Sequence, residues 1–143
     1  MDITHHLTIK ASASTIYKAV SSQEGITGWW SKDCVVGSTP GSSSTLKFDK
    51  QGTLVVMHFK TLELNPDQKV IWEATENANP AWIGTHISTQ ITETEEGCSV
   101  IFSHSGFDTQ WAGKDPFELT KGGWEHFVKS LTSYCETGEG QPW

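Results

Sequence analysis

The sequence predicts an α+β fold in which a curved antiparallel sheet of about six to seven strands wraps around a long C-terminal helix, with two short helices after the first strand. Two observations lead to this prediction. Segments that alternate between apolar and polar residues follow one another through most of the chain, joined by short turns, as in an antiparallel meander. The last third instead carries one apolar stripe at helical spacing, and it alone is long and apolar enough to cover the concave face of the sheet.

Length and composition indicate one globular domain spanning residues 1–143. The formal net charge of −7 excludes nonspecific binding to nucleic acid, which needs a basic surface. No segment approaches the roughly 18 apolar residues of a membrane span, so no membrane insertion is expected. The N-terminal residues lack a signal-peptide pattern and the three cysteines form no C-x-x-C motif, so we expect a cytoplasmic protein without a disulfide framework.

The N-terminal elements come first in the chain. Residues 3–10 alternate between apolar and polar positions and predict a half-buried strand. Ser12 is a suitable N-cap for a short helix with one apolar face. Residues 25–30 predict a second short helix or a turn, and the run of Gly, Ser, Thr and Pro at 37–44 predicts a loop within the domain.

Strand patterns dominate the middle of the chain. The pattern at residues 44–49 is weak, whereas that at 53–64 is strong and ends at the turn Asn65-Pro66-Asp67. The predicted strands are, in order, residues 44–49, 53–64, 69–75, 82–93 and 98–105.

The last third predicts the long helix. Asp115-Pro116 suits a cap and first turn, and Gly138 and Gly140 are expected to end the helix. Gly122-Gly123 inside the helix costs roughly 1 kcal/mol per residue relative to alanine. Such a pair suggests a kink or a close backbone approach beside Trp124. The apolar stripe consists of Trp124, Phe127, Val128, Leu131 and Cys135.

Several short motifs occur in a recognisable order: ASASTIYKAV at 11–20, the pair Trp29-Trp30, LELNP at 62–66 with VIW at 70–72, SHSGF at 103–107, and GGW at 122–124 with LTSYCETG at 131–138. In this order the chain resembles the helix-grip superfamily, which includes lipid-transfer START domains, birch-pollen-allergen-like proteins and polyketide cyclases. It is most similar to the branch named after the homologue of the heat-shock-chaperone ATPase activator, whose members are mostly small bacterial proteins. Residue 13 departs from the family pattern, because alanine stands where proline is usual.

The resemblance implies a helix-grip fold with a hydrophobic cavity between the sheet and the C-terminal helix, but it implies no reaction. We expect the following residues to contact a ligand in that cavity: Trp29, Trp30, Glu63, Trp72, Ile87, Phe102, His104, Trp124, Phe127 and Leu131. The tryptophans either fill the core or line the cavity.

Two polar candidates each allow two interpretations. His104 shares the inward strand face of Phe102, so it is either a core histidine with satisfied hydrogen bonds or a hydrogen-bonding group of the cavity wall. Glu63 is in step with Met57 and Phe59, so it is either a strand-end group near solvent or a polar anchor at the end of the cavity.

The leading hypothesis is a cytoplasmic protein that binds a small apolar or aromatic ligand, with no cofactor and no metal. One alternative is an enzyme of the cyclase, dehydratase or hydrolase kind in the same cavity, although the sequence has no catalytic signature such as G-x-S-x-G or H-E-x-x-H. Another is a protein-interaction module of the chaperone-cofactor kind. A homodimer and a chaperone partner remain open.

Overall fold

The computed structural model describes residues 1–143 and contains seven strands, three α-helices and two short 3₁₀ helices. The strands are Ile3–Ile9 (β1), Asp33–Val35 (β2), Ser43–Lys50 (β3), Thr53–Asn65 (β4), Lys69–Asn77 (β5), His86–Thr94 (β6) and Gly97–Ser105 (β7). The helices are Ala13–Ser21 (α1), Gln23–Trp29 (α2) and Asp115–Thr137 (α3), with 3₁₀ turns at Pro80–Trp82 and Thr109–Trp111.

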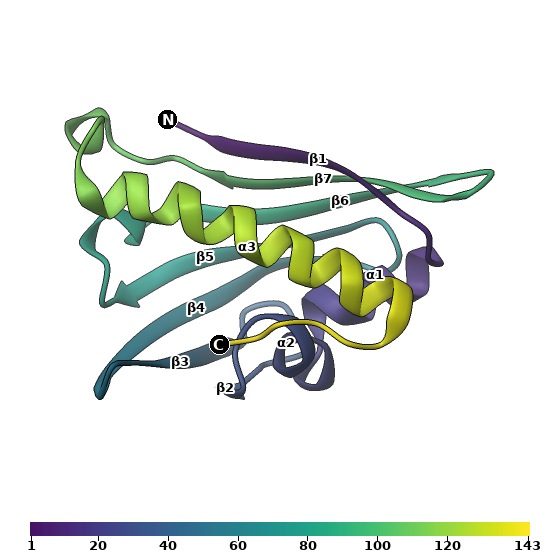
Figure 1. Ribbon diagram of the computed structural model, residues 1–143, viewed down its shortest axis with the longest axis horizontal. Helices are drawn as coiled ribbons and strands as arrows, with labels where there is room; N and C mark the ends of the chain where they lie inside the picture. Colours follow the sequence, from purple (N-terminus) through teal and green to yellow (C-terminus); the bar gives the residue numbers. More distant parts are fainter.

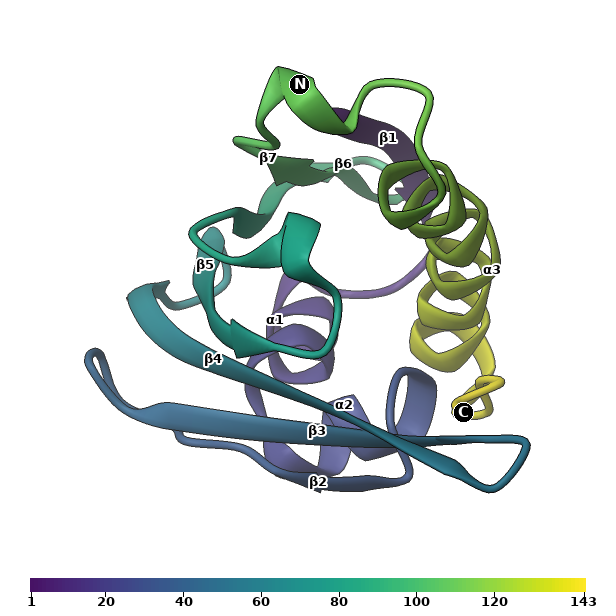
Figure 2. The same ribbon diagram turned by 90° about the vertical axis from the view of Figure 1, so that its left-hand side faces the viewer.

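All strands belong to one antiparallel sheet in the order β1-β7-β6-β5-β4-β3-β2. The sheet is therefore the predicted meander, with β1 added beside β7. Figure 1 shows α3 running along the sheet, and Figure 2 shows the sheet curling from β1 to β2 with α3 closing its open side. The helices α1 and α2 lie at one end of the curled sheet (Figure 2). The predicted α+β helix-grip architecture is confirmed.

Serine caps shape the two short helices. The Ser12 hydroxyl accepts a hydrogen bond from the Thr15 amide at 3.1 Å, as its position predicted. Ser22 ends α1 and also caps α2, because its hydroxyl accepts from the Gly25 amide at 3.0 Å. An added Cβ at Gly25 would collide with the carbonyl of Lys18, so glycine permits the close contact between the two helices.

The strand predicted at 82–93 begins later, at His86. Asn79 caps a 3₁₀ turn by accepting from the Ala81 amide at 3.0 Å, and Pro80 occupies the first turn. This turn buries Trp82 and leaves Ile83 59% exposed. The alternating pattern extended into the turn because Trp82 and Ile83 are apolar, although only one of them is buried. The edge strand β2 lay outside all the predicted strands, and it is only three residues long.

A bulge in β4 places Glu63 on the solvent side. Thr61 pairs with Trp72, but Glu63 pairs with the next residue, Ile71, so β4 has one extra residue between the two pairs. The extra residue reverses the alternation, and the side chain of Glu63 is exposed. The prediction of Glu63 as a polar anchor inside the cavity is therefore wrong.

The long helix has the predicted buried stripe. Its start differs, because Lys114 occupies the N-cap without a side-chain hydrogen bond and Asp115 is already helical. Gly138 ends the helix at φ 86°, where its amide donates to the carbonyl of Tyr134. A Cβ added at Gly122 or Gly123 would meet no atom within 4 Å, apart from the neighbouring backbone of the helix itself. The expected close approach of another segment to this backbone is therefore absent.

Candidate functional site

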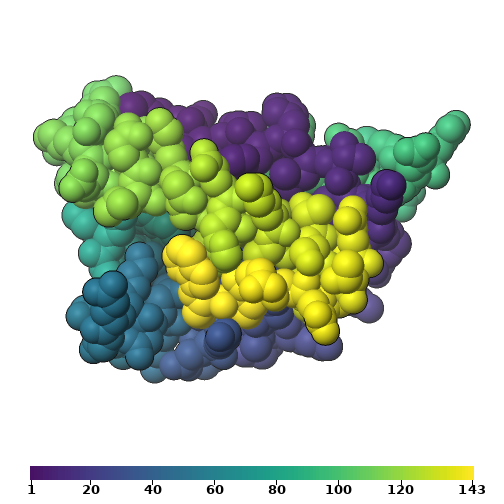
Figure 3. All heavy atoms as spheres, viewed as in Figure 1, coloured from purple at the N-terminus to yellow at the C-terminus, as the bar shows by residue number.

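A pocket of about 640 Å³ opens at one end of the grip, between the β3–β4 hairpin, residues 78–82 and the first half of α3. Figure 3 shows this face of the molecule, with the hairpin in blue below the start of α3 in green. The exposed rim includes Lys50, Asp115, Glu118 and Leu119. Six aromatic residues line the pocket: Trp30, Phe48, Trp82, Trp124, Phe127 and Trp143.

The floor of the pocket is a layer of aromatic rings in contact. The ring centroids of Trp30 and Trp124 lie 5.2 Å apart. Trp82 stacks on Trp124 with an interplanar angle of 16°. Below this layer Trp30 packs on Phe59 at 5.5 Å and stacks on Trp72 at 6.0 Å. The deeper part of the grip is therefore filled with rings, and the open volume lies above them.

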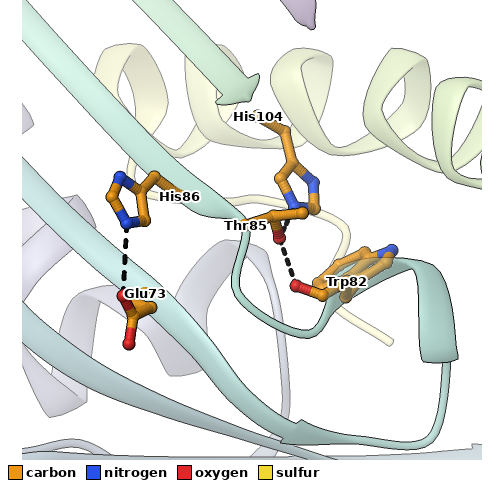
Figure 4. A network of polar contacts seen from close by, with 5 residues as sticks. All are labelled: Glu73, Trp82, Thr85, His86 and His104. Carbon is orange, nitrogen blue, oxygen red and sulfur yellow. Dashed lines mark hydrogen bonds and ion pairs between the residues drawn. The ribbon is translucent and has the colours of Figure 1, made fainter. Parts of the chain in front are cut away.

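A buried hydrogen-bond chain holds two of these rings. An indole nitrogen can only donate, so the 2.9 Å contact between Trp124 Nε1 and His104 Nδ1 makes Nδ1 the acceptor. The proton of neutral His104 therefore lies on Nε2, which donates to Thr85 Oγ1 at 2.7 Å. The Thr85 hydroxyl in turn donates to the carbonyl of Trp82. Figure 4 shows His104, Thr85 and Trp82 in this arrangement.

The chain leaves His104 without a free nitrogen for a ligand. The residue is fully buried, and burial lowers its pKa from 6.5 to about 3, because the charged imidazolium would lose its hydration. His104 is thus a core histidine with satisfied hydrogen bonds, the first of its two interpretations. Its role is to fix the orientation of Trp124 and, through Thr85, the backbone of Trp82.

A second set of hydrogen bonds fixes Trp82 from the helix side. Trp82 Nε1 donates to Thr120 Oγ1 at 2.8 Å. Thr120 donates onward to the carbonyl of Pro116 at 2.7 Å, and Asn79 Nδ2 donates to the same carbonyl at 3.0 Å. The pocket wall between residues 79–82 and α3 is consequently tied together by polar contacts.

The C-terminal residues form the lower edge of the pocket. The Trp143 amide donates to the carbonyl of Trp30, and the Lys32 amide donates to the carbonyl of Trp143, both at 3.0 Å. The Trp143 ring lies 4.7 Å from the Phe127 ring and stacks on His126 at the same distance. The sequence offered no explanation for Trp143, because this contact depends on how the chain returns after Gly138.

Of the ten predicted ligand contacts, Trp30, Trp124 and Phe127 line the pocket. Trp29 and Leu131 are buried behind it, and the Trp29 indole donates to the carbonyl of Ala19 at 2.7 Å. The other seven residues lie outside the pocket: Trp29, Glu63, Trp72, Ile87, Phe102, His104 and Leu131. Glu63 is turned to solvent by the bulge, and the other six are buried between the sheet and the helices, where side chains fill the space.

Three further aromatic residues line the pocket although the sequence does not predict them as ligand contacts: Phe48, Trp82 and Trp143. Phe48 lies in the strand whose sequence pattern is weakest. Its alternation with the polar residues on either side is the signal that could have identified it as an inward-facing residue. The sequence predicts Trp82 for either the core or the cavity wall, but it does not predict the 3₁₀ turn that brings Trp82 to the pocket.

Other titratable clusters lie apart from the pocket. Glu73 and His86 form a contact of 3.3 Å between Oε2 and Nε2, and both side chains are over a third exposed (Figure 4). No group of three or more His, Cys, Asp or Glu residues converges in a metal-binding arrangement. None of the helices combines the length and hydropathy of a membrane-spanning segment.

Comparison with known proteins agrees with this architecture. Residues 10–136 match the family of Activator of Hsp90 ATPase homolog 1-like proteins. The chain is 32% identical to an Aha1 protein from Colwellia psychrerythraea, whose dimer has a solution structure, with a TM-score of 0.79 and coverage of 98% of this chain and 99% of that one. No curated protein matches the sequence.

More distant structures share the fold. Protein SSP2350 from Staphylococcus saprophyticus is 22% identical, with a TM-score of 0.74 and coverage of 99% of this chain and 96% of that chain. An AHSA1-like protein from Aeromonas hydrophila is 12% identical, with a TM-score of 0.72 and coverage of 94% and 91%. The family match over most of the chain and the shared fold lead to one conclusion: this chain belongs to the Activator of Hsp90 ATPase homolog 1-like family.

Proposed function

We propose that this protein binds a small apolar or aromatic molecule in the pocket above the aromatic floor. The observation that supports the proposal is the pocket itself, with a volume of about 640 Å³ and six aromatic side chains in its wall. Small-molecule sites are typically mostly apolar concavities of about 300–1,000 Å³ that contain a few polar groups. Asn79 and Thr120 are the uncharged polar residues of this wall.

The rigidity of the wall favours binding. Trp82 and Trp124 are held by hydrogen bonds to Thr120 and His104, so a ligand does not have to order them. A ligand that buries about 300 Å² of apolar surface gains roughly 7 kcal/mol before the entropic costs of association. A gain of roughly 7 kcal/mol corresponds to a Kd of about 7 μM before those costs, so a flat apolar probe is expected to bind more weakly than about 10 μM.

The proposal can be tested with Nile red, a neutral fluorescent dye whose emission rises in apolar surroundings. Ala78→Trp places a large side chain at an exposed position of the pocket wall. Ala112→Trp makes the same change at an exposed position outside the pocket. We expect wild type and Ala112→Trp to bind the dye alike, and Ala78→Trp to bind at least about tenfold more weakly. Equal binding by all three proteins would contradict the proposal.

The enzyme alternative receives less support from the geometry. An enzyme of that kind needs a carboxylate or a histidine inside the pocket, but His104 is enclosed in the core and Glu63 is exposed beyond the bulge. Neither residue lines the pocket.

A second candidate function is association with protein partners. It is favoured by the family description, which names an activator of the Hsp90 ATPase, and by the dimer of the relative from Colwellia psychrerythraea. We propose homodimerisation as the form to test first, since that relative is 32% identical over nearly the whole chain. Native mass spectrometry at several protein concentrations would show a dimer mass, whereas a monomer mass throughout would contradict it. A chaperone partner and a cytoplasmic location remain proposals, the latter resting on three unpaired cysteines.

A further inference from the structure

Two adjacent glycines in α3 have no structural need to be glycine. Gly122 and Gly123 lie well inside the helix Asp115–Thr137, where each costs roughly 1 kcal/mol relative to alanine. Neither has the positive φ that favours glycine. An added Cβ at either position would meet no other atom within 4 Å beyond the adjacent helix backbone. Packing and backbone geometry therefore leave the presence of both glycines unexplained.

Their position suggests what they do. Both glycines line the pocket, next to the floor residue Trp124. The helix consequently presents bare backbone to the pocket along this stretch, where any other residue would project a side chain into it. Natural proteins keep destabilising residues where function requires them. A flat wall of this kind suits the face of a planar ring.

The floor also contains a hydrogen-bond donor without a partner. The indole groups of Trp82 and Trp124 donate to Thr120 and His104, but Trp30 Nε1 donates to no protein atom. Trp30 is only 2% exposed and lines the pocket. Its indole nitrogen is not fully enclosed, in contrast to the unpartnered indole nitrogen of Trp72. The N–H therefore retains accessible surface, and because Trp30 lines the pocket we take this donor as the one that a ligand acceptor reaches.

The charges around the pocket favour a neutral ligand. Lys50 and Asp115 lie on the rim with opposite signs. The third charged residue, Glu118, already forms a 3.2 Å ion pair with Lys121. The net charge of −7 on the whole chain further disfavours an anion.

We propose that the ligand is a neutral, planar aromatic molecule that carries a carbonyl-type hydrogen-bond acceptor. Its ring face lies against the bare helix wall of Gly122 and Gly123, and its acceptor oxygen receives the indole N–H of Trp30. Gly122 and Gly123 are thus specificity determinants, because the side-chain-free backbone leaves room for a ring to lie directly against the helix. The inference rests on the proposed function, because it names the ligand class of the same pocket.

A matched pair of probes tests the acceptor. 9-Fluorenone and fluorene share a planar ring system, but only fluorenone carries a carbonyl oxygen. In displacement of Nile red we expect wild type to bind fluorenone about fivefold more tightly than fluorene, as one added hydrogen bond provides. Trp30→Phe keeps a ring and removes the N–H, so the ratio of the two affinities should fall to about one. A wild-type ratio of one would overturn the assignment of Trp30, whether or not the variant folds.

The glycine wall has its own signature, in which stability and binding change in opposite directions. Gly123→Ala should raise Tm by about 3–5 °C, because it restores helix propensity in open space. The same variant should bind both probes about tenfold more weakly, because the methyl group enters the pocket. Gly122→Ala is expected to behave likewise. Glu125→Ala, on the exposed side of α3 and outside the pocket, is the control and should leave both affinities unchanged.

The possible failures are distinguishable. If wild type does not bind Nile red, or Ala78→Trp binds it normally, the proposed function itself fails, and the ligand class fails with it. If Nile red binds in the pocket but Gly123→Ala and Gly122→Ala hold both probes as tightly as wild type, only the assignment of the glycine wall is overturned.

Discussion

Acid should destabilise this protein through one buried residue, His104. In the folded state burial lowers the pKa of His104 to about 3, whereas the unfolded chain has the ordinary value of 6.5. Between these two values the unfolded state binds a proton that the folded state does not. The free energy of unfolding therefore falls as the pH falls through 6.5 and continues to fall until about pH 3.

The size of the effect follows from the two pKa values. Each pH unit below the unfolded-state pKa removes about 1.4 kcal/mol. Between pH 7 and pH 4.5 the contribution of His104 amounts to a loss of about 2.5 kcal/mol. Domains of this size have total stabilities of about 5–15 kcal/mol, so the loss is readily measured.

The assay is urea denaturation at pH 7 and pH 4.5 for wild type and His104→Gln. Glutamine does not titrate, and its amide offers an acceptor for Trp124 and a donor for Thr85. All other titratable groups are the same in both proteins, so their contributions cancel in the comparison. We expect wild type to lose about 2.5 kcal/mol more than His104→Gln over this interval.

A control separates titration from weakened packing. Phe102→Leu loosens the same core, where Phe102 meets Trp124 at 4.8 Å, but leaves His104 in place. It should be less stable than wild type at both pH values and lose the same amount on acidification. If wild type and His104→Gln lose equal stability, the buried neutral histidine is not the acid-sensitive group and the reasoning is refuted.

Three further predictions concern the core, the helix end and the cysteines. Trp72→Phe should change the free energy of unfolding by only about 1 kcal/mol, because the indole nitrogen of Trp72 is buried without a partner. Trp124→Phe should cost about 2–4 kcal/mol, because it leaves the acceptor nitrogen of His104 without its donor. Equal losses in urea denaturation would contradict this difference. Gly138→Ala should lower stability by about 1 kcal/mol, because the left-handed φ of 86° strains alanine, and an unchanged Tm would argue against that C-cap. At pH 8 a thiol reagent should modify the half-buried Cys34 before Cys135, because burial raises the pKa of Cys135 to about 12 and keeps its thiol protonated and unreactive. Rapid modification of Cys135 in the folded protein would count against the packing described.

The fold was largely predictable because its signals are local. Alternation with period two marks the strands, and the stripe that begins at Trp124 marks the helix, so both elements and their inward faces follow from short stretches of sequence. The bulge beside Glu63 depends on the pairing with β5. A one-residue slip reverses every later side chain in the strand, and nothing in the alternation of residues 53–64 reveals it.

The site was less predictable because the sequence shows which residues point inward but not what fills the space between them. Trp29 and Trp30 are adjacent, yet the first is packed in the core and the second lines the pocket. The sequence allows two interpretations of His104 because its partners, Thr85 and Trp124, lie 19 and 20 residues away in the chain. Such contacts arise only when the sheet closes around the helix.

The most direct test of ligand binding is a ¹H–¹⁵N NMR titration of the protein with 9-fluorenone. The indole N–H signals of Trp30 and Trp29 and the amide signals of Gly122 and Gly123 report on different places in the fold. The account predicts progressive, saturable shifts for Trp30, Gly122 and Gly123, and a stationary signal for Trp29, whose indole is bonded to Ala19 behind the pocket. The absence of saturable shifts, or shifts centred on Trp29, would contradict the account.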